Sequence, residues 1–156
     1  MKTKILSCLV LILFVVQACG QNSPKTHISP QTTKTTADDK TSILEMLREF
    51  YTSYITECDK MPINEQNITD LKNRYFTKEF LKKLEEAEID YDPVLNAQDC
   101  DKDWIKTLEI NPVVEKENTY QVCYHYDTSE GKRTICVTLF LVKVNEKYLI
   151  NGIDNL

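Results

Sequence analysis

The spacing of apolar residues changes at Trp104, and this change restricts the chain to few kinds of fold. Before Trp104, apolar residues recur every three or four positions, as on one face of a helix. After it, apolar and polar residues alternate in short segments, as in strands with one buried face. Because the connections between these later segments are short, the sequence predicts an α+β domain in which helices precede an antiparallel meander.

The first helix is expected to begin at Ser42, because Ser42 and Glu45 have the spacing of a capping box. Met61-Pro62 ends it, and two shorter helices are expected over about residues 68–75 and 77–88. The apolar residues of the first helix share one face and are interpreted as core: Ile43, Leu47, Phe50, Tyr54 and Cys58.

Four strands are expected, from Leu108 to about Pro112 and over residues 120–127, 133–144 and 148–153. If Asp127 pairs with Lys132, the apolar residues of the second and third strands match along one face. A slip of one residue would place one strand's apolar side chains on the opposite face. The matched pairs in this register are Tyr124 with Ile135, Val122 with Val137, and Tyr120 with Leu139.

The same register places Cys123 opposite Cys136, and we therefore predict a disulfide between them. Four cysteines follow Cys19, an even number that is typical of disulfides in an exported chain and that allows three connectivities. The predicted cross-strand bond leaves Cys58 and Cys100 to form the second disulfide.

The N-terminus indicates export and attachment to a membrane. Lys2 and Lys4 precede an apolar run and then Val16-Gln17-Ala18-Cys19, which resembles the lipobox of bacterial lipoproteins. We expect a signal peptide over residues 1–18, a lipidated Cys19 with a flexible polar tether over 19–41, and one domain over 42–156. The alternative is a simple signal peptide cleaved near Ala18.

Charge limits the partners of the protein. The formal net charge is −5 at pH 7, so nucleic acid is an unfavourable partner and an anionic lipid surface would repel the chain. Membrane attachment would therefore come from acyl chains. Gln21-Asn22-Ser23-Pro24 lacks an acidic run, which favours the periplasmic face of the outer membrane of a Gram-negative bacterium over export to the cell surface.

The densest charge lies between Glu85 and Asp103, where eight acidic residues face one lysine. Asp99 to Asp103 resembles the start of a calcium loop, but Trp104 and Ile110 stand where an EF-hand requires glycine and glutamate. A solvated acidic loop is the favoured interpretation, and no metal site or cofactor is expected. The acidic residues are Glu85, Glu86, Glu88, Asp90, Asp92, Asp99, Asp101 and Asp103.

Catalytic motifs are missing from the sequence. His125 is the one histidine of the expected domain, and the chain has three glycines and neither Gly-x-Ser-x-Gly nor His-Glu-x-x-His. If the cysteines are oxidised, no thiol nucleophile remains. We therefore expect a protein that is not an enzyme.

The block from Asp90 to Asp99, Asp-Tyr-Asp-Pro-Val-Leu-Asn-Ala-Gln-Asp, resembles bacterial lipoproteins and periplasmic proteins of the YbjP/YqhG type. It follows Tyr75-Phe76-Thr77-Lys78-Glu79-Phe80-Leu81 and precedes Trp104, as in that family, and the resemblance runs from about Ile43 to the C-terminus. The family has no assigned activity. The resemblance implies a cystatin-like or nuclear-transport-factor-like cone, with helices packed on a curved four-stranded antiparallel sheet.

The same block has two interpretations. Aspartate before proline favours a turn, and Gln98 and Asp99 can bind loop amides, so the block can be structural. Alternatively, it forms a binding site at the mouth of the cone. The candidate binding residues are Asp90, Asp92, Gln98, Asp99 and Trp104.

The sequence is compatible with three functions. The first is a lipid-anchored periplasmic binding or adaptor domain with a protein partner. The second is an immunity protein whose acidic loop masks the basic surface of a secreted antibacterial toxin. The third is a small-ligand or enzymatic pocket beside Trp104.

Overall fold

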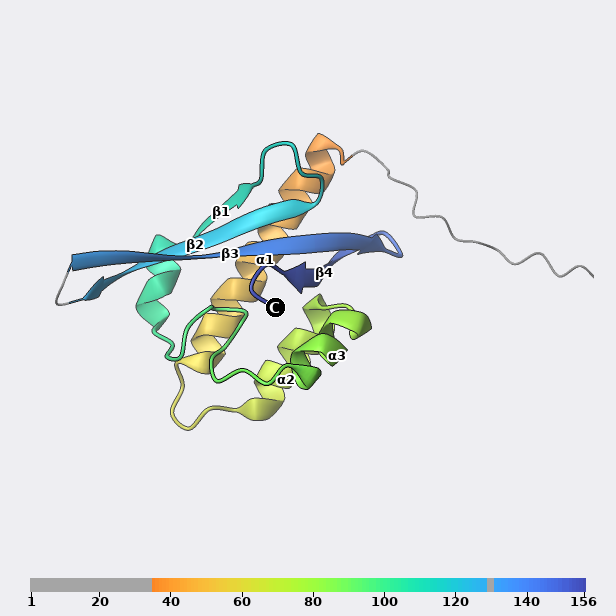
Figure 1. The fold of residues 1–156 in the computed structure, drawn as a ribbon. Helices are drawn as coiled ribbons and strands as arrows, with labels where there is room; N and C mark the ends of the chain where they lie inside the picture. The colour runs from red at the N-terminus through yellow and green to blue at the C-terminus, as the bar shows by residue number, and fades with distance from the viewer. Residues whose placement is uncertain (1–34, 129–130) are drawn as a thin grey trace, which may run out of the picture. The chain divides into compact units, whose positions relative to one another are not determined.

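The computed structural model describes residues 35–128 and 131–156, in which helices come first and four strands follow (Figure 1). The predicted signal peptide, Cys19 and most of the predicted tether lie outside the described residues. The sheet is an antiparallel meander in the order β1-β2-β3-β4, which confirms the α+β prediction. The elements are α1 (Ala37–Cys58), α2 (Glu65–Tyr75), α3 (Lys78–Glu86), a 3-10 helix η1 (Lys102–Thr107), β1 (Glu109–Pro112), β2 (Thr119–Thr128), β3 (Gly131–Val144) and β4 (Lys147–Ile153).

Helix α1 begins earlier than the sequence predicts. Its N-cap is Thr36, whose hydroxyl oxygen accepts from the Asp39 amide at 3.1 Å, while the Asp39 carboxylate accepts from the Thr36 amide at 3.1 Å. This reciprocal pair is a capping box, and it adds five residues to the helix relative to a start at Ser42. Residues 37–41, assigned to the tether by the sequence, are therefore helical.

The core lies between α1 and one face of the sheet. Figure 1 shows α1 crossing that face, with α2 and α3 near β4 and the C-terminal half of α1. Phe50 is at the centre of an aromatic cluster, with ring centroids 5.1–5.4 Å from those of its neighbours. Four residues of the predicted stripe of α1 are buried, Cys58 is only partly buried, and two residues outside the stripe are buried as well. The buried residues of α1 are Ile43, Leu47, Phe50, Tyr51, Tyr54 and Ile55.

The register of the central hairpin is the predicted one. Asp127 pairs with Lys132, the apolar pairs follow along the inner face, and Cys123 lies opposite Cys136. The two cysteines form a disulfide on the outer face of the sheet. The prediction succeeded because two independent features, the apolar match and the cysteine pair, select one register.

The two edges of the sheet are protected in different ways. At β4, the Thr77 amide donates to the Ile150 carbonyl at 2.9 Å, and the Thr77 hydroxyl bonds the Asn151 side chain at 2.8 Å. The junction of α2 and α3 therefore covers this edge. At the other edge, β1 is only four residues long and ends at Pro112, and short strands and proline both discourage pairing with another chain.

None of the helices in the described part is long and apolar enough to cross a membrane.

Candidate protein-binding surface

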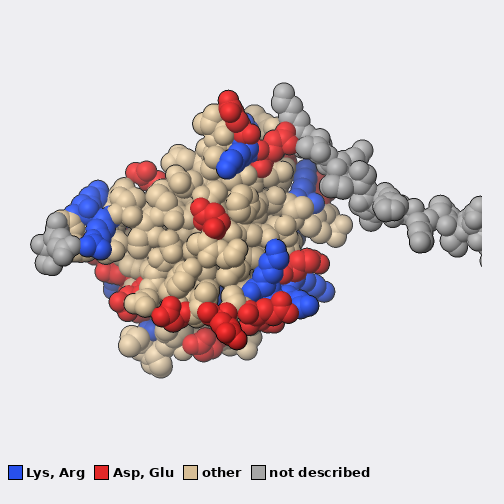
Figure 2. Space-filling view, viewed as in Figure 1, with Lys and Arg blue, Asp and Glu red and all other residues tan. Residues whose placement is uncertain are grey.

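The acidic segment, residues Glu85–Asp103, carries most of its charged side chains on the molecular surface. It runs from the last turn of α3 through an irregular loop into the start of η1. Figure 2 shows acidic side chains gathered along the lower edge of the view, where Figure 1 places α2, α3 and the following loop. The centre of the same face, over β2 and β3, is mostly uncharged. The exposed acidic residues are Glu85, Glu86, Glu88, Asp90, Asp99, Asp101 and Asp103.

A tight turn at Asp92 gives the acidic segment a fixed shape. The Asp92 amide donates to the Ala97 carbonyl at 2.8 Å, and the Ala97 amide donates back to the Asp92 carbonyl at 3.2 Å. One carboxylate oxygen of Asp92 also accepts from the amides of Val94 and Leu95, at 2.8 and 3.2 Å. Aspartate organises turns in this way because its short side chain reaches the backbone two and three residues further on.

Three tyrosines from the core hold this turn in place. Tyr54 donates to the second carboxylate oxygen of Asp92 at 2.6 Å, and Tyr51 donates to the Val94 carbonyl at 3.1 Å. Tyr124, on β2, donates to the Leu95 carbonyl. Burial raises the pKa of each phenol, so all three remain neutral donors at physiological pH.

The turn is also tied to the C-terminus. Tyr91 donates to the Asn155 carbonyl, and the Asn155 side-chain amide donates to the Pro93 carbonyl, both at 3.1 Å. Val94 and Leu95 are each 1% exposed, so they act as apolar anchors in the core. The structural interpretation of this block is therefore correct for its centre.

The five candidate binding residues separate into two groups. Asp90, Gln98 and Asp99 are exposed and lie on either side of the turn. The other two residues face the protein itself: the Asp92 carboxylate accepts the hydrogen bonds that hold the turn, and Trp104 is 6% exposed. The predicted set therefore does not converge on one cavity.

Trp104 belongs to the core. Its ring stacks on Tyr124 with centroids 4.5 Å apart and contacts Tyr126 at 5.9 Å. These aromatic rings fill the space beside it. These contacts add no support to a small-ligand or enzymatic pocket beside Trp104, which stays a prediction.

The C-terminal end of the acidic segment is held by local hydrogen bonds. Asp101 caps η1 by accepting from the Asp103 amide at 2.8 Å, and Asp103 pairs with Lys106 at 2.7 Å. The hydrogen bond from Lys106 lowers the pKa of the Asp103 carboxyl. In the part of the chain that the structure describes, no group of three His, Cys, Asp or Glu side chains is placed to hold a metal ion.

His125 has partners that a search for catalytic groups would notice. Its Nδ1 lies 2.8 Å from the Thr134 hydroxyl, and its Nε2 lies 3.8 Å from the Glu109 carboxylate. These groups stand on the open face of the sheet, and none of them lines a cavity described below. Acid–base chemistry requires a site that positions a substrate against the base, so this group gives no support to an enzymatic role.

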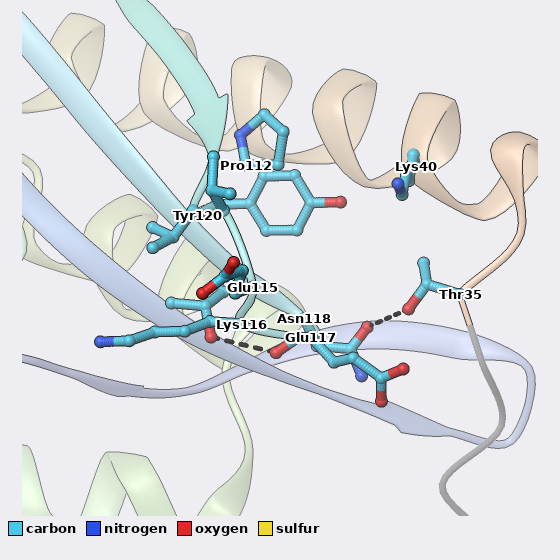
Figure 3. Close-up of a pocket in the computed structure, with 11 residues that line it drawn as sticks. Thr35, Lys40, Pro112, Glu115, Lys116, Glu117, Asn118 and Tyr120 are labelled. Carbon is cyan, nitrogen blue, oxygen red and sulfur yellow. Dashed lines mark hydrogen bonds between the residues drawn. The ribbon is translucent and has the colours of Figure 1, made fainter.

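A surface pocket that the sequence did not predict lies between the N-terminus of α1 and the β1–β2 loop (Figure 3). Its volume is about 480 Å³, and Tyr120, 2% exposed, lies on its wall. The Thr35 hydroxyl donates to the Asn118 side chain at 2.8 Å across its mouth. Val114 is 84% exposed on the loop. Two further cavities, of about 370 and 280 Å³, are lined partly by Arg74.

The backbone of the β1–β2 loop explains why sequence patterns missed this pocket. Glu115 and Asn118 have φ values of 64° and 50°, in the left-handed region that side chains other than glycine, asparagine and aspartate rarely adopt. The signal that could have indicated a surface loop is Pro112 together with the polar run from Glu115 to Asn118.

The fold has counterparts among solved structures. A protein of unknown function from Bacteroides thetaiotaomicron VPI-5482 is 28% identical over 74% of this chain and 94% of its own, with a TM-score of 0.62. A chain of the type VI effector–immunity complex Tae3-Tai3 from Ralstonia pickettii is 20% identical over 73% of this chain and 94% of its own, with a TM-score of 0.53.

No family model and no curated protein matches the chain. The resemblance to proteins of the YbjP/YqhG type therefore stays a prediction. The likeness to the Ralstonia complex establishes a shared fold.

Proposed function

We propose that this protein is an immunity protein that binds a secreted antibacterial toxin and blocks it, with the acidic segment as the main contact surface. The observation that carries the proposal is a charged surface held rigidly to the core by the Asp92 turn and three tyrosines. The shared fold with a chain of an effector–immunity complex supports this class of partner. The proposal requires binding only, and no catalytic group.

The arrangement suits a basic partner for a physical reason. Glu85, Glu88, Asp90 and Asp99 are exposed, and the structure gives them no ion pair with the described residues. Their charges are therefore available for pairing across an interface. Because the loop that carries Asp90 and Asp99 is ordered before binding, little conformational entropy is lost when a partner docks.

We further propose that lipidation at Cys19 anchors the domain to the outer membrane, facing the periplasm, where a toxin delivered into the cell envelope would meet it. Mass spectrometry of the N-terminal peptide of the native protein tests this step. A diacylglycerol on the Cys19 sulfur supports it, and an unmodified thiol at the new N-terminus contradicts it.

The function is tested by neutralisation. A candidate toxin, taken from a gene that neighbours this one, is produced in the periplasm of a host cell, with or without the full-length chain, and growth is recorded. The wild-type chain should restore growth. The variant Glu88→Gln/Asp99→Asn should restore it less well, because it removes two exposed charges from the acidic segment without removing any described hydrogen bond.

The matched control is Glu115→Gln/Glu117→Gln, which removes two exposed charges from the β1–β2 loop. It should protect as well as wild type. If the control loses protection and the acidic-segment variant keeps it, the toxin binds the β1–β2 loop and not the acidic segment. If the wild-type chain gives no protection against the neighbouring toxin, the immunity function fails, and the lipid-anchored adaptor becomes the better hypothesis.

A further inference from the structure

We propose that Cys58 and Cys100 form a thiol–disulfide exchange site, in which Cys58 attacks the disulfide of an oxidant and Cys100 resolves the mixed disulfide. Both residues are thiols in the structure, so it does not contain the second disulfide that the sequence predicts between them, and both are partly exposed. The oxidant is a disulfide-bearing molecule such as an oxidised protein dithiol. This inference is independent of the proposed function, because it concerns the thiols themselves.

The fold brings the two cysteines to the same place. The Cys100 thiol donates to the carbonyl of Ile55, three residues before Cys58 in the last turn of α1, at a sulfur–oxygen distance of 3.6 Å. One comes from the last residue of α1 and the other from the acidic segment. The backbone on both sides is fixed nearby, since the Lys102 amide donates to the Asp59 carboxylate at 3.1 Å.

The environment shifts the pKa values of the two thiols in opposite directions. The hydrogen bond from Cys100 lowers the pKa of Cys58. The same bond, together with burial, raises the pKa of Cys100. The attacking species in disulfide exchange is the thiolate, so these directions assign the first attack to Cys58.

The exchange balances in two steps. The Cys58 thiolate attacks one sulfur of the oxidant's disulfide, forms a mixed disulfide and releases the other sulfur as a thiolate, which takes up a proton. Cys100 then loses its proton and attacks the Cys58 sulfur, which forms the Cys58–Cys100 bond and releases the second thiol. The protein loses two electrons and two protons, and the oxidant's disulfide is reduced to two thiols.

The bond would change one part of the molecule. It would join the last turn of α1 covalently to the acidic segment, beside the Asp59–Lys102 hydrogen bond. Amide exchange in residues 99–103 should therefore slow when the bond forms, because local opening of this segment would then require α1 to move with it.

The test uses oxidised glutathione as the probe. The full-length chain is reduced, transferred to a glutathione redox buffer, quenched in acid, alkylated and digested with trypsin without reductant. The expected product links residues 49–60 to residues 84–102. The Cys123–Cys136 bond, which links residues 117–132 to residues 134–143, is the internal control for complete oxidation.

Single variants test the assigned roles. Cys100→Ser should accumulate a glutathione adduct on Cys58, because nothing resolves it. Cys58→Ser should accumulate several-fold less adduct on Cys100 in the same time. Equal or greater adduct in Cys58→Ser would overturn the assignment of the attacking thiol.

The wild-type measurement stands if a variant fails to fold. If Cys58 and Cys100 are both alkylated in buffer that fully oxidises Cys123 and Cys136, the exchange site does not exist. Because no binding partner enters this experiment, its failure is distinct from a failure of the immunity function.

Discussion

Asp90 and Asp92 are two positions apart and carry the same charge, but only Asp92 is tied to the core. Its carboxylate accepts from two backbone amides and from the Tyr54 hydroxyl, whereas Asp90 is exposed. Asp92→Ala should lower the free energy of unfolding by about 3 kcal/mol, since hydrogen bonds to a charged group are lost and their donors are left without an acceptor. Urea unfolding followed by circular dichroism measures this change.

Asp90→Ala is the matched control for that measurement. It removes an exposed carboxylate of the same size, so the free energy of unfolding should stay within about 0.5 kcal/mol of wild type. Equal losses in the two variants would mean that charge, and not the turn, explains the effect. A small loss in Asp92→Ala would show that the buried side chains and the other hydrogen bonds of the turn hold it without the Asp92 carboxylate.

The sequence separated these two aspartates only in part. Both flank Tyr91 in a stretch without periodicity, and Asp92 alone precedes a proline, which indicates a turn but not the partners of its carboxylate. What separates them is the position of Tyr54, thirty-eight residues earlier on α1. Helical spacing correctly predicted that Tyr54 faces the core, but its polar tip finds a partner only in the folded chain. The charge of the acidic segment was thus predictable, whereas its anchoring was not.

At the level of elements, the start of α1 gives a direct comparison between a predicted cap and an observed one. Thr36 caps the helix, whereas Ser42 lies within it. Thr36→Ala should cost about 1 kcal/mol in the free energy of unfolding, because the Asp39 amide loses its acceptor. Ser42→Ala should be neutral or slightly stabilising, since alanine is the better helix former. Urea unfolding of both variants distinguishes the two caps, and the opposite order would place the helix start at Ser42.

The same cap predicts a dependence on pH. The hydrogen bond from the Thr36 amide lowers the pKa of Asp39 below its ordinary value of 3.8. A carboxyl with a lowered pKa in the folded state stabilises the protein at neutral pH, and this contribution is lost as pH falls below about 4. Asp39→Asn should therefore be less stable than wild type at pH 7, and the difference should shrink at pH 3. A difference that is constant between pH 7 and pH 3 would contradict this role of the carboxylate.

The elements also differ in how far the sequence could predict them. The β2–β3 hairpin was predictable to the residue, because apolar pairing and Cys123–Cys136 agree on one register. The β1–β2 loop was not, because the positive φ values of Glu115 and Asn118 leave no mark on composition. The N-cap of α1 was predicted wrongly for a simpler reason. Two pairs have capping-box spacing, Thr36 with Asp39 and Ser42 with Glu45, and the sequence does not say which one starts the helix.

At the level of the whole molecule, the two candidate surfaces lie at opposite ends of α1. The acidic segment meets the end of this helix at Ile55 and Asp59, and the β1–β2 pocket is lined by Lys40 in its first turn. A helix of 22 residues is about 33 Å long. Charge changes on one surface are therefore screened from the other, since the Debye length at physiological salt is about 8 Å.

This separation allows a kinetic test of the acidic segment. If the segment steers a basic toxin, the association rate constant should fall about tenfold or more between low and high salt, with a much smaller change in the dissociation rate constant. Glu88→Gln/Asp99→Asn should associate more slowly than wild type at low salt and approach it at high salt, because salt screens the removed charges. Glu115→Gln/Glu117→Gln should follow the wild-type curve. Stopped-flow binding measures the rate constants of wild type and both variants. An association rate constant that does not change with salt concentration would show that the toxin does not recognise this surface by its charge.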